Sequence, residues 1–462
     1  MDHGRAVTLL SLLSPGIRAV LVKGEPGTGK TLLAFELLRL HGKGVYISTR
    51  VTEEKTLEQY PGVKRLFKQG KLSLVNPKTR GAKFDDVRLG TAPIVIESLL
   101  HSISKLKEPL VILDSWDTVA KELEHVERMK TEKSLLAIAD AGKARFLFIS
   151  EEPTLTTMDY LVDAIVVLKD ELHEGRRVRK IEWRKLRGME IPQESQLFSL
   201  WDARFTVFQP EIALDVHAKH KAKPFQPVKN TTEYYSTGSK DLDALTLGGL
   251  ERGSTILLEL GRRLGARWDL PLLASISCNF IANGGCTAFL PVLGVSPEMV
   301  DEAHLSILPK EIVESSIRIA HFGETPATDT CFFQLDPSSL SKSFDMFWQV
   351  VGQLTKVGEG RRPNLTILSI DRLEMMFGHE YITPIFARGP AMTRYYGDAT
   401  IYIAKHSTTG KGTLADATTM HLKLDEIDGA LVIHSVRPPS RIHKVSYDYS
   451  QGYPSVKLTP VA

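Results

Sequence analysis

The sequence has only three cysteines among its 462 residues, at Cys278, Cys286 and Cys331, and they show no metal-binding spacing. Because three is also an odd number, we expect free and mostly buried thiols in a reducing compartment rather than a disulfide framework. No apolar run approaches the roughly 18 residues that cross a membrane. The first residues, Met-Asp-His-Gly-Arg, lack the basic-then-apolar form of a signal peptide. The sequence therefore predicts a cytoplasmic protein with no membrane association.

The chain also carries little net charge, since its acidic and basic residues nearly balance and the formal net charge is only +3. A nucleic-acid-binding domain usually carries a strongly basic surface, so the overall balance gives no support for nucleic-acid binding. The hydrophobic and charged fractions, 42% and 24%, are those of an ordinary globular protein. The length predicts two domains of roughly 200 residues each.

One stretch carries a complete phosphate-binding motif. Residues 23–31 read Lys-Gly-Glu-Pro-Gly-Thr-Gly-Lys-Thr, with a predicted strand before them (19–22) and a predicted helix after them (32–40). Glycines let the backbone curl so that its N–H groups face phosphate oxygens, and the helix N-terminus adds partial positive charge. Lys30 is expected to reach the β- and γ-phosphates of ATP, and the Thr31 hydroxyl to bind Mg²⁺. The predicted nucleotide-binding residues are Gly24, Glu25, Pro26, Gly27, Thr28, Gly29, Lys30 and Thr31.

A second candidate site residue is Asp114, which follows the apolar run of residues 110–113. Such a run is typical of a buried parallel strand with its carboxylate at the carboxyl edge of the sheet. In phosphate-loop folds an aspartate at this place orders Mg²⁺ or its water shell. The alternative is that Asp114 only caps the segment after it.

Strands and helices alternate through the first half, which predicts an α/β domain with a parallel sheet covered on both faces. We expect helices over 95–106 and 127–141. Two later segments alternate apolar and polar residues as an antiparallel extension would. The expected strands are 45–48, 71–76, 146–150 and 164–169, with the antiparallel segments at 177–183 and 196–200.

The most basic stretch lies within this extension. Three interpretations stay open for it: a solvated strand face, a phosphate contact between subunits, or a patch for nucleic acid or an acidic partner. Its cations are Arg176, Arg177, Arg179, Lys180, Arg184, Lys185 and Arg187. A polar, proline-punctuated segment then indicates an interdomain linker at 209–232, between domains 1–208 and 233–462.

The second half repeats marks of the first. Counting from its predicted strand (255–259), Gly265 matches Gly29, but Ala266 and Arg267 stand where Lys30 and Thr31 stand. The second loop is therefore expected to lack standard Mg-ATP binding. Two strands also find counterparts: 365–371 resembles the strand ending in Asp114, and 398–403 resembles 163–168. Residues 419–424 and 430–435 are expected to form a hairpin around Asp428-Gly429, a turn dipeptide.

The Ser-Thr-Gly … Leu-Asp … Gly-Gly-Leu … Arg-Gly pattern at 236–253 resembles the lead-in to a RecA/KaiC-type ATPase domain, and the tandem repeat is similar to KaiC-type proteins. The first half, with Tyr-Ile-Ser-Thr-Arg at 46–50, is more similar to the archaeal GvpD-type regulators, KaiC-like proteins of gas-vesicle systems. The resemblance implies two tandem RecA-like phosphate-loop domains, each a mostly parallel sheet flanked by helices.

The resemblance also bears on catalysis. KaiC-type domains place two glutamates after the second strand to activate water, whereas Thr49 and Arg50 stand there in this chain and Glu53 and Glu54 come later. Hydrolysis is therefore expected to be slow, with Glu151 as the fallback candidate for orienting water. The alternative is that Glu151 is only a helix-capping or solvent-exposed acid.

The segment Lys185-Leu186-Arg187-Gly188 is similar to the Lys-x-Arg-Gly segment that reaches a neighbouring subunit's γ-phosphate. This similarity implies that Lys185 and Arg187 act across a homo-oligomer, a ring or a stack.

We therefore expect a slow Mg-ATP-dependent ATPase that serves as a nucleotide-controlled regulator or assembly. One alternative is a regulator that binds ATP without hydrolysis to control a protein partner such as a transcription factor. Another is a RecA/RadA-like DNA-binding recombination protein. The low net charge, and the lack of an obvious small DNA-binding module, weigh against recombination.

Overall fold

A computed structural model describes residues 7–48, 53–75, 99, 101, 103–210, 223–265, 267–323 and 331–462. The chain divides into two compact units, Met1–Pro210 with Val461–Ala462, and Glu211–Pro460, referred to below as the first and second unit. Half of the predicted linker (211–222) and half of the predicted helix 95–106 lie outside the described residues. No helix of the described part is long and apolar enough to span a membrane.

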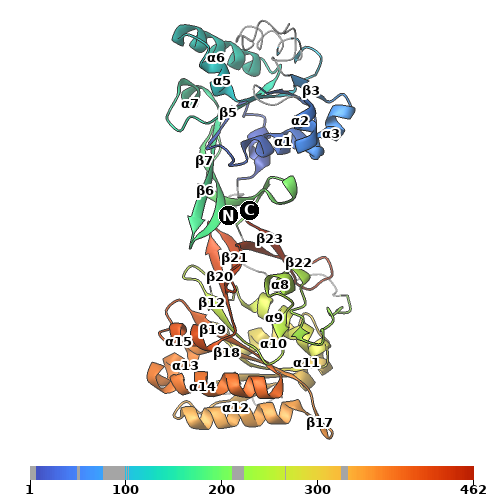
Figure 1. Ribbon diagram of the computed structural model, residues 1–462, viewed down its shortest axis with the longest axis vertical. Helices are drawn as coiled ribbons and strands as arrows, with labels where there is room; N and C mark the ends of the chain where they lie inside the picture. The colour runs from blue at the N-terminus through green and yellow to red at the C-terminus, as the bar shows by residue number, and fades with distance from the viewer. Residues whose placement is uncertain are drawn as a thin grey trace. The chain divides into compact units, whose positions relative to one another are not determined.

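The first unit is built on a nine-stranded sheet in the order β3-β2-β4-β5-β1-β6-β7-β8-β9 (Figure 1). In this order the six strands from β3 to β6 run parallel, and β7, β8 and β9 continue the sheet, each pairing antiparallel with the strand before it. The strands are β1 (Ala19–Gly24), β2 (Gly44–Ser48), β3 (Leu72–Val75), β4 (Leu110–Asp114), β5 (Arg145–Ser150), β6 (Ala164–His173), β7 (Arg176–Leu186), β8 (Ser195–Ser199) and β9 (Thr206–Val207). The predicted strands and the antiparallel extension are confirmed.

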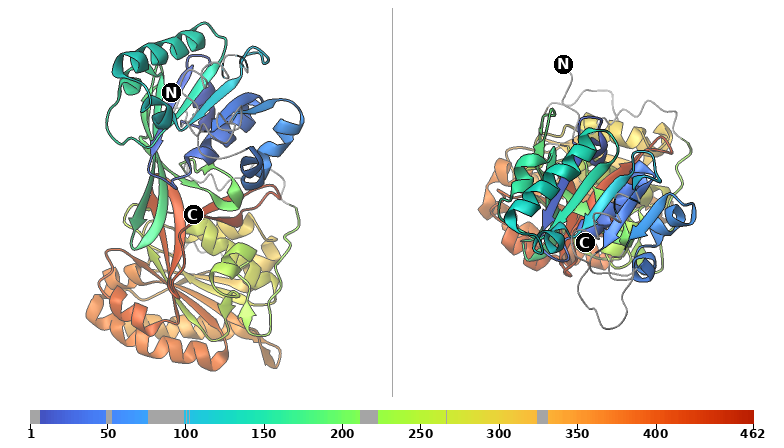
Figure 2. Two further views of the ribbon diagram at one scale, coloured as in Figure 1. Left: turned by 45° about the horizontal axis from the view of Figure 1, so that its top comes forward. Right: turned by 90° about the horizontal axis from the view of Figure 1, so that it is seen from above.

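Helices cover both faces of this sheet, as a parallel sheet requires. On one face Leu33 and Leu37 of α1 pack against Val20 and Ile112. The other face carries a separate apolar cluster that includes the buried side chain of Trp116. The first face holds the 3₁₀ helix η1 (Leu9–Leu13) and the helices α1 (Lys30–His41), α2 (Glu53–Gln59) and α3 (Pro61–Lys68). The second face holds α5 (Trp116–Ala120), α6 (His125–Asp140) and α7 (Thr157–Leu161) (Figure 2). The short 3₁₀ turn η2 (Trp201–Ala203) follows β8.

The second unit is built on a ten-stranded sheet in the order β15-β14-β13-β18-β19-β12-β20-β21-β22-β23. In this order the strands from β15 to β20 run parallel, and β21, β22 and β23 each pair antiparallel with the strand before them. They are β12 (Thr255–Leu260), β13 (Cys286–Leu290), β14 (Ile317–His321), β15 (Phe332–Gln334), β18 (Asn364–Ser369), β19 (Ala399–Lys405), β20 (Met420–Ile427), β21 (Ala430–Arg437), β22 (His443–Asp448) and β23 (Ser455–Pro460). The strand pairs β10 (Tyr234–Tyr235) with β11 (Leu250–Glu251), and β16 (Lys356–Val357) with β17 (Gly360–Arg361), are separate from it.

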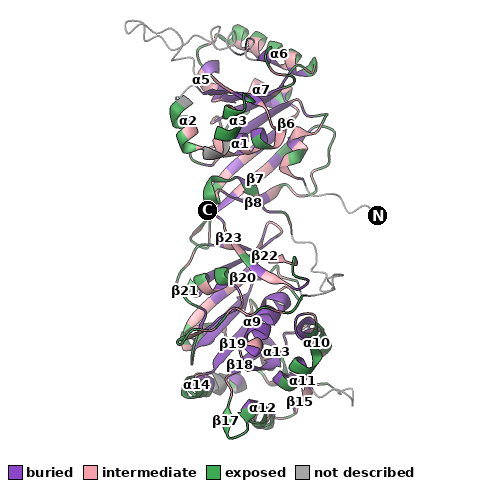
Figure 3. Cartoon of the chain, turned by 90° about the vertical axis from the view of Figure 1, so that its right-hand side faces the viewer, coloured by how far each residue is buried: buried purple, intermediate pink, exposed green. Residues whose placement is uncertain are grey.

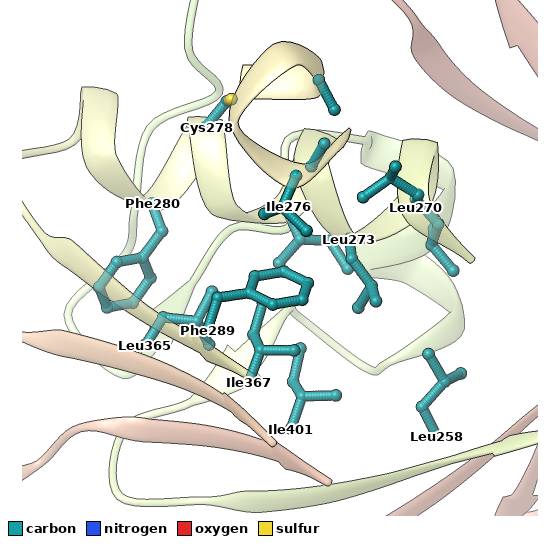
Figure 4. Close-up of a cluster of buried hydrophobic side chains, with 14 of the residues drawn as sticks. Leu258, Leu270, Leu273, Ile276, Cys278, Phe280, Phe289, Leu365, Ile367 and Ile401 are labelled. Atoms are coloured by element: carbon teal, nitrogen blue, oxygen red, sulfur yellow. The ribbon is translucent and has the colours of Figure 1, made fainter. Parts of the chain in front are cut away.

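Helices again cover both faces, and the parallel strands are buried along most of their length (Figure 3). In Figure 4, Leu273 and Ile276 of α9 face Phe289, Ile367 and Ile401 of three neighbouring strands. The helices are α8 (Lys240–Leu245), α9 (Leu270–Ala282), α10 (Pro297–Leu305), α11 (Lys310–Ser316), α12 (Leu340–Thr355), α13 (Ile370–Phe377), α14 (His379–Tyr396) and α15 (Lys411–Ala417). Cys278, Cys286 and Cys331 are buried thiols outside any disulfide in the described part of this unit, as predicted.

The two sheets share one strand order around their central strands, since β5-β1-β6 corresponds to β19-β12-β20. The predicted fold class, two tandem RecA-like α/β domains, is confirmed. The predicted hairpin is also confirmed: β20 and β21 pair antiparallel around Asp428 and Gly429, which both have positive φ, 49° and 78°.

One repeat assignment is wrong. Of the residues 398–403, all but Asp398 belong to β19. This strand lies between β18 and β12 as β5 lies between β4 and β1, so its counterpart is β5 and not 163–168. The counterpart of β6 is β20. The strand β5 and the first residues of β6 are both short apolar runs, and sequence likeness alone does not show which of the two corresponds to β19.

Candidate nucleotide-binding site

The loop from β1 to α1 needs glycine at three positions. Gly24, Gly27 and Gly29 have φ of +153°, +81° and +100°, a region that favours glycine. A Cβ atom on Gly24 would lie 2.6 Å from the Leu168 carbonyl oxygen, and one on Gly29 would lie 2.9 Å from the Leu200 side chain. The loop therefore has the tight curl that brings backbone N–H groups and a helix N-terminus to one point.

Lys30 is the first residue of α1, and its side chain is buried. Its ammonium donates hydrogen bonds of 2.7 Å to the carbonyl oxygens of Gly24 and Glu25. The Glu151 carboxylate at the end of β5 lies 3.9 Å away. The structure thus brings together two predicted site residues that are far apart in the sequence.

Thr31 and Asp114 meet beside this lysine. The Thr31 hydroxyl donates a 2.8 Å hydrogen bond to Asp114 Oδ2, and the Tyr46 hydroxyl donates one of 2.9 Å to the same oxygen. Burial, and next the charge of Asp114, raise the pKa of Tyr46 far above its ordinary range, so this phenol is a neutral donor. The peptide bond between Asp114 and Ser115 is cis.

These groups fit Mg-ATP. A hydroxyl and a carboxylate oxygen are the donors that Mg²⁺ prefers, and it commonly keeps several waters. Lys30, the loop amides and the α1 N-terminus are the donors that phosphate oxygens need. The loop with Gly24, Gly27 and Gly29 leaves the space beside its backbone free of side chains at these positions, as phosphate binding requires.

Two residues that sequence reasoning missed support this centre. Asp117, in the first turn of α5, accepts hydrogen bonds from the Ser150 hydroxyl (2.9 Å) and the Glu151 N–H (2.5 Å), and so fixes the end of β5 that carries Glu151. Its position three residues after Asp114 was an available signal. Tyr46 had no such signal, because an aromatic residue within an apolar strand is typical of core.

The structure does not bring Arg187 to this loop, and Lys185 reaches only the wall of a cavity beside it. Lys185 donates to the carbonyl oxygens of Asp159 (3.1 Å) and Tyr160 (3.2 Å), and Arg187 pairs with Asp163 at 2.9 Å. Arg187 follows the end of β7 that lies beside the start of β1, whereas the loop follows the end of β1. Burial, and next Arg187, lower the pKa of Lys185.

Most other cations of the basic stretch have acidic partners on the same ribbon of β6 and β7. Arg177 pairs with Asp170, Lys180 with Glu171, and Arg184 with Glu182. Arg179 is buried and donates a 3.2 Å hydrogen bond to the Gly27 carbonyl oxygen of the loop. These pairs favour the solvated-strand interpretation over a nucleic-acid patch.

A cavity of about 890 Å³ lies beside the loop, on the side of α7 and β6. Its walls carry charged and apolar residues, including Glu25, Pro26, Glu151, Leu155, Tyr160 and Lys185. Leu155 and Tyr160 are 75% and 71% exposed. The cavity has the size of a small-molecule pocket and continues from the phosphate loop.

The loop after β12 differs from the first loop. Nine residues (261–269) separate β12 from α9, whereas five (25–29) separate β1 from α1. The helix therefore begins at Leu270 and Pro271, later than the counted match to Ala266 and Arg267; Ala266 itself lies outside the described residues. Neither residue at the helix start supplies an ammonium or a hydroxyl.

Ion pairs inside the second unit occupy the carboxyl edge of its sheet. Lys405 lies 3.3 Å from Asp371 and donates 2.8 Å to the Leu293 carbonyl oxygen. On β12 the Glu259 carboxylate pairs with Lys411 at 2.7 Å and His421 at 3.0 Å. Burial alone would raise the pKa of Glu259, but the hydrogen bonds from His421 and Lys411 lower it to about 2.

Residues 14–211 match the family model described as "ATPase: KaiC". Protein GvpD2 of Halobacterium salinarum is 28% identical over 475 aligned positions, 96% of this chain and 93% of the relative. Protein GvpD1 of the same organism is 24% identical, over 95% and 93%. The circadian clock oscillator protein KaiC of Rippkaea orientalis is 25% identical, over 64% and 63%. The resemblance predicted from the sequence motifs is confirmed.

Proposed function

We propose that this chain, whose first unit is a KaiC-like ATPase domain, binds Mg-ATP in the loop Gly24–Thr31 and acts as a nucleotide-controlled regulator or assembly. The carrying observation is the Thr31–Asp114 hydrogen bond beside the buried Lys30. We assign nucleotide binding to residues 1–208 and a regulatory or assembly role to 233–462, with 209–232 as linker. A cytoplasmic location, predicted from the cysteine usage, belongs to the same proposal.

Each residue has a role in this proposal. Lys30 and the loop amides would hold the phosphates, while Thr31 and Asp114 would hold the metal; Mg²⁺ would neutralise negative charge on the phosphate oxygens. Lys30 would exchange its two bonds to loop carbonyls for bonds to phosphate oxygens. Tyr46 would keep Asp114 in place through its hydrogen bond.

Glu151 would orient a water molecule and accept its proton at a carboxylate oxygen. Asp117 supports this role by fixing the Glu151 backbone. The Glu151 carboxylate lies 3.9 Å from the Lys30 ammonium. Slow turnover is expected because Thr49 and Arg50 stand at the place of the family's glutamates, although those two residues lie outside the described part.

Lys185 and Arg187 would act on the nucleotide of a neighbouring copy. The position of Arg187 supports this, because within one chain Arg187 is bound to Asp163 at the other end of β1 from the loop. A ring or stack would then complete each site with cations from the next subunit.

ATP binding tests the proposal. Equilibrium dialysis with Mg-ATP is expected to show saturable binding by the wild type, loss of binding by Lys30→Ala and unchanged binding by Arg263→Ala, an exposed residue of the loop after β12. A wild type that binds no nucleotide contradicts the proposal.

A second candidate is a regulator that binds ATP without turnover and controls a protein partner. The observation that favours it is the absence of a glutamate pair directly after β2, where the sequence has Thr49 and Arg50. Phosphate release separates the two: the first proposal predicts slow release that stops in Lys30→Ala, and the second predicts none.

A further inference from the structure

Arg179 is the one cation of the basic stretch whose described contacts reach the phosphate loop. It lies on β7 opposite Asp170 of β6, two residues beyond Leu168, the residue that pairs with Gly24. The β6–β7 ribbon therefore continues past the carboxyl end of β1 and places Arg179 beside the loop. Its Nη1 donates to the Gly27 carbonyl oxygen at 3.2 Å.

The environment of this guanidinium is costly. The Arg179 side chain is 8% exposed, and its Nε–H has no hydrogen-bond partner among the described residues. Burial, and next the charge of Arg177, lower the pKa of Arg179, although an arginine stays protonated at any ordinary pH. A buried charge with an unused donor destabilises a fold unless another charge compensates it.

Compensation within the chain is incomplete. The Asp170 carboxylate lies 3.5 Å from Arg179, but it also accepts three hydrogen bonds from Arg177, two of them from Nε at 2.8 and 2.7 Å and one from Nη2. One carboxylate thus serves two guanidinium groups, and the closer one is exposed Arg177. Among these three side chains one positive charge is left over, and Arg179 places it next to the phosphate loop.

We infer that Arg179 is a positioning residue for nucleotide phosphates: it fixes the loop through Gly27 and, together with Asp170, sets the positive potential of the cradle. This inference rests on the proposed function and deepens it. The ligand class is a nucleoside polyphosphate, and the effect grows with the number of phosphate charges. Asp170 weakens the effect, because its negative charge offsets part of that of Arg179.

The two side chains therefore have opposite expected effects. Removing Arg179 lowers the potential, so Arg179→Ala is expected to weaken Mg-ATP binding by about tenfold, the size of one unit charge at about 10 Å in a partly screened site. The loss is expected to be smaller for ADP. Removing the charge of Asp170 raises the potential, so Asp170→Asn is expected to tighten Mg-ATP binding by about threefold. If Arg177, Arg179 and Asp170 only stabilised the fold, both Arg179→Ala and Asp170→Asn would weaken Mg-ATP binding.

Arg177 supplies the matched control, since it pairs with the same carboxylate but has no described contact with the loop. Arg177→Ala is expected to change the ATP affinity less than Arg179→Ala. Arg179→Lys keeps the charge and is expected to recover part of the lost affinity. Thermal unfolding of each variant shows whether the fold is retained.

The test is titration of fluorescent ATP and ADP analogues against the wild type and these four variants. Weaker ATP binding in Arg179→Ala with tighter binding in Asp170→Asn supports the inference. Equal affinity of Arg179→Ala and the wild type, or weaker binding in both Arg179→Ala and Asp170→Asn, overturns it while the proposed function stands. A wild type that binds neither nucleotide overturns both.

Discussion

The Thr31 hydroxyl lies 2.8 Å from the Asp114 carboxylate, although 83 positions separate these residues in the chain. The first turn of α1 and the end of β4 meet there, at the carboxyl edge of the first sheet. A hydroxyl and a carboxylate in contact beside a buried lysine form a ready site for a hydrated divalent cation.

Thr31→Ala and Asp114→Asn are therefore expected to weaken ATP binding in Mg²⁺ by about tenfold or more, since a bond to a charged group contributes about 1.5–3 kcal/mol. In EDTA the same variants are expected to bind ATP about as well as the wild type. Binding measured with and without Mg²⁺ checks this. Equal losses in both conditions would mean that these residues act on the fold and not on the metal.

Glu151→Gln is expected to slow phosphate release at least tenfold while leaving ATP binding in place, because a general base contributes about 10²–10⁴-fold. Glu152→Gln is the matched control, an adjacent carboxylate whose described bonds go to Thr154. Single-turnover hydrolysis is the measurement. Equal rates in Glu151→Gln and the wild type would remove Glu151 from the mechanism.

A mixing experiment tests the role across subunits. Lys30→Ala cannot hold phosphate, and Arg187→Ala cannot assist a neighbour, so each alone is expected to be inactive in hydrolysis. In mixed oligomers an intact loop can meet an intact Arg187, and part of the activity is expected to return. Mixtures that stay as inactive as the separate variants, despite proven co-assembly, would refute action in trans.

Glu259 gives a pH prediction for the second unit. Its folded pKa of about 2 lies below the ordinary 4.5, so the unfolded chain binds the proton more tightly. The stability that Glu259 provides is thus complete above pH 4.5 and is lost as pH falls toward 2. Thermal unfolding of Glu259→Gln is expected to depend less on pH across this window. A pH dependence as steep as that of the wild type would exclude Glu259 as its source.

Local sequence predicts the phosphate loop and the strand before Asp114 because each depends on a few adjacent residues. Long-range register decides the rest. The Gly27–Arg179 contact depends on how far the β6–β7 ribbon continues past β1, and no spacing in the sequence encodes that. The later helix start at Leu270 has a similar cause, since counting from a strand assumes a loop of fixed length.

The most direct test of the central claim is the stoichiometry of Mg-ATP binding to the full chain, measured by isothermal titration calorimetry. One functional loop and a second loop without lysine or hydroxyl predict one ATP per chain, and none in Lys30→Ala. Two ATP molecules per chain would contradict the account of the second unit. No binding by the wild type, or undiminished binding by Lys30→Ala, would contradict the site at Gly24–Thr31.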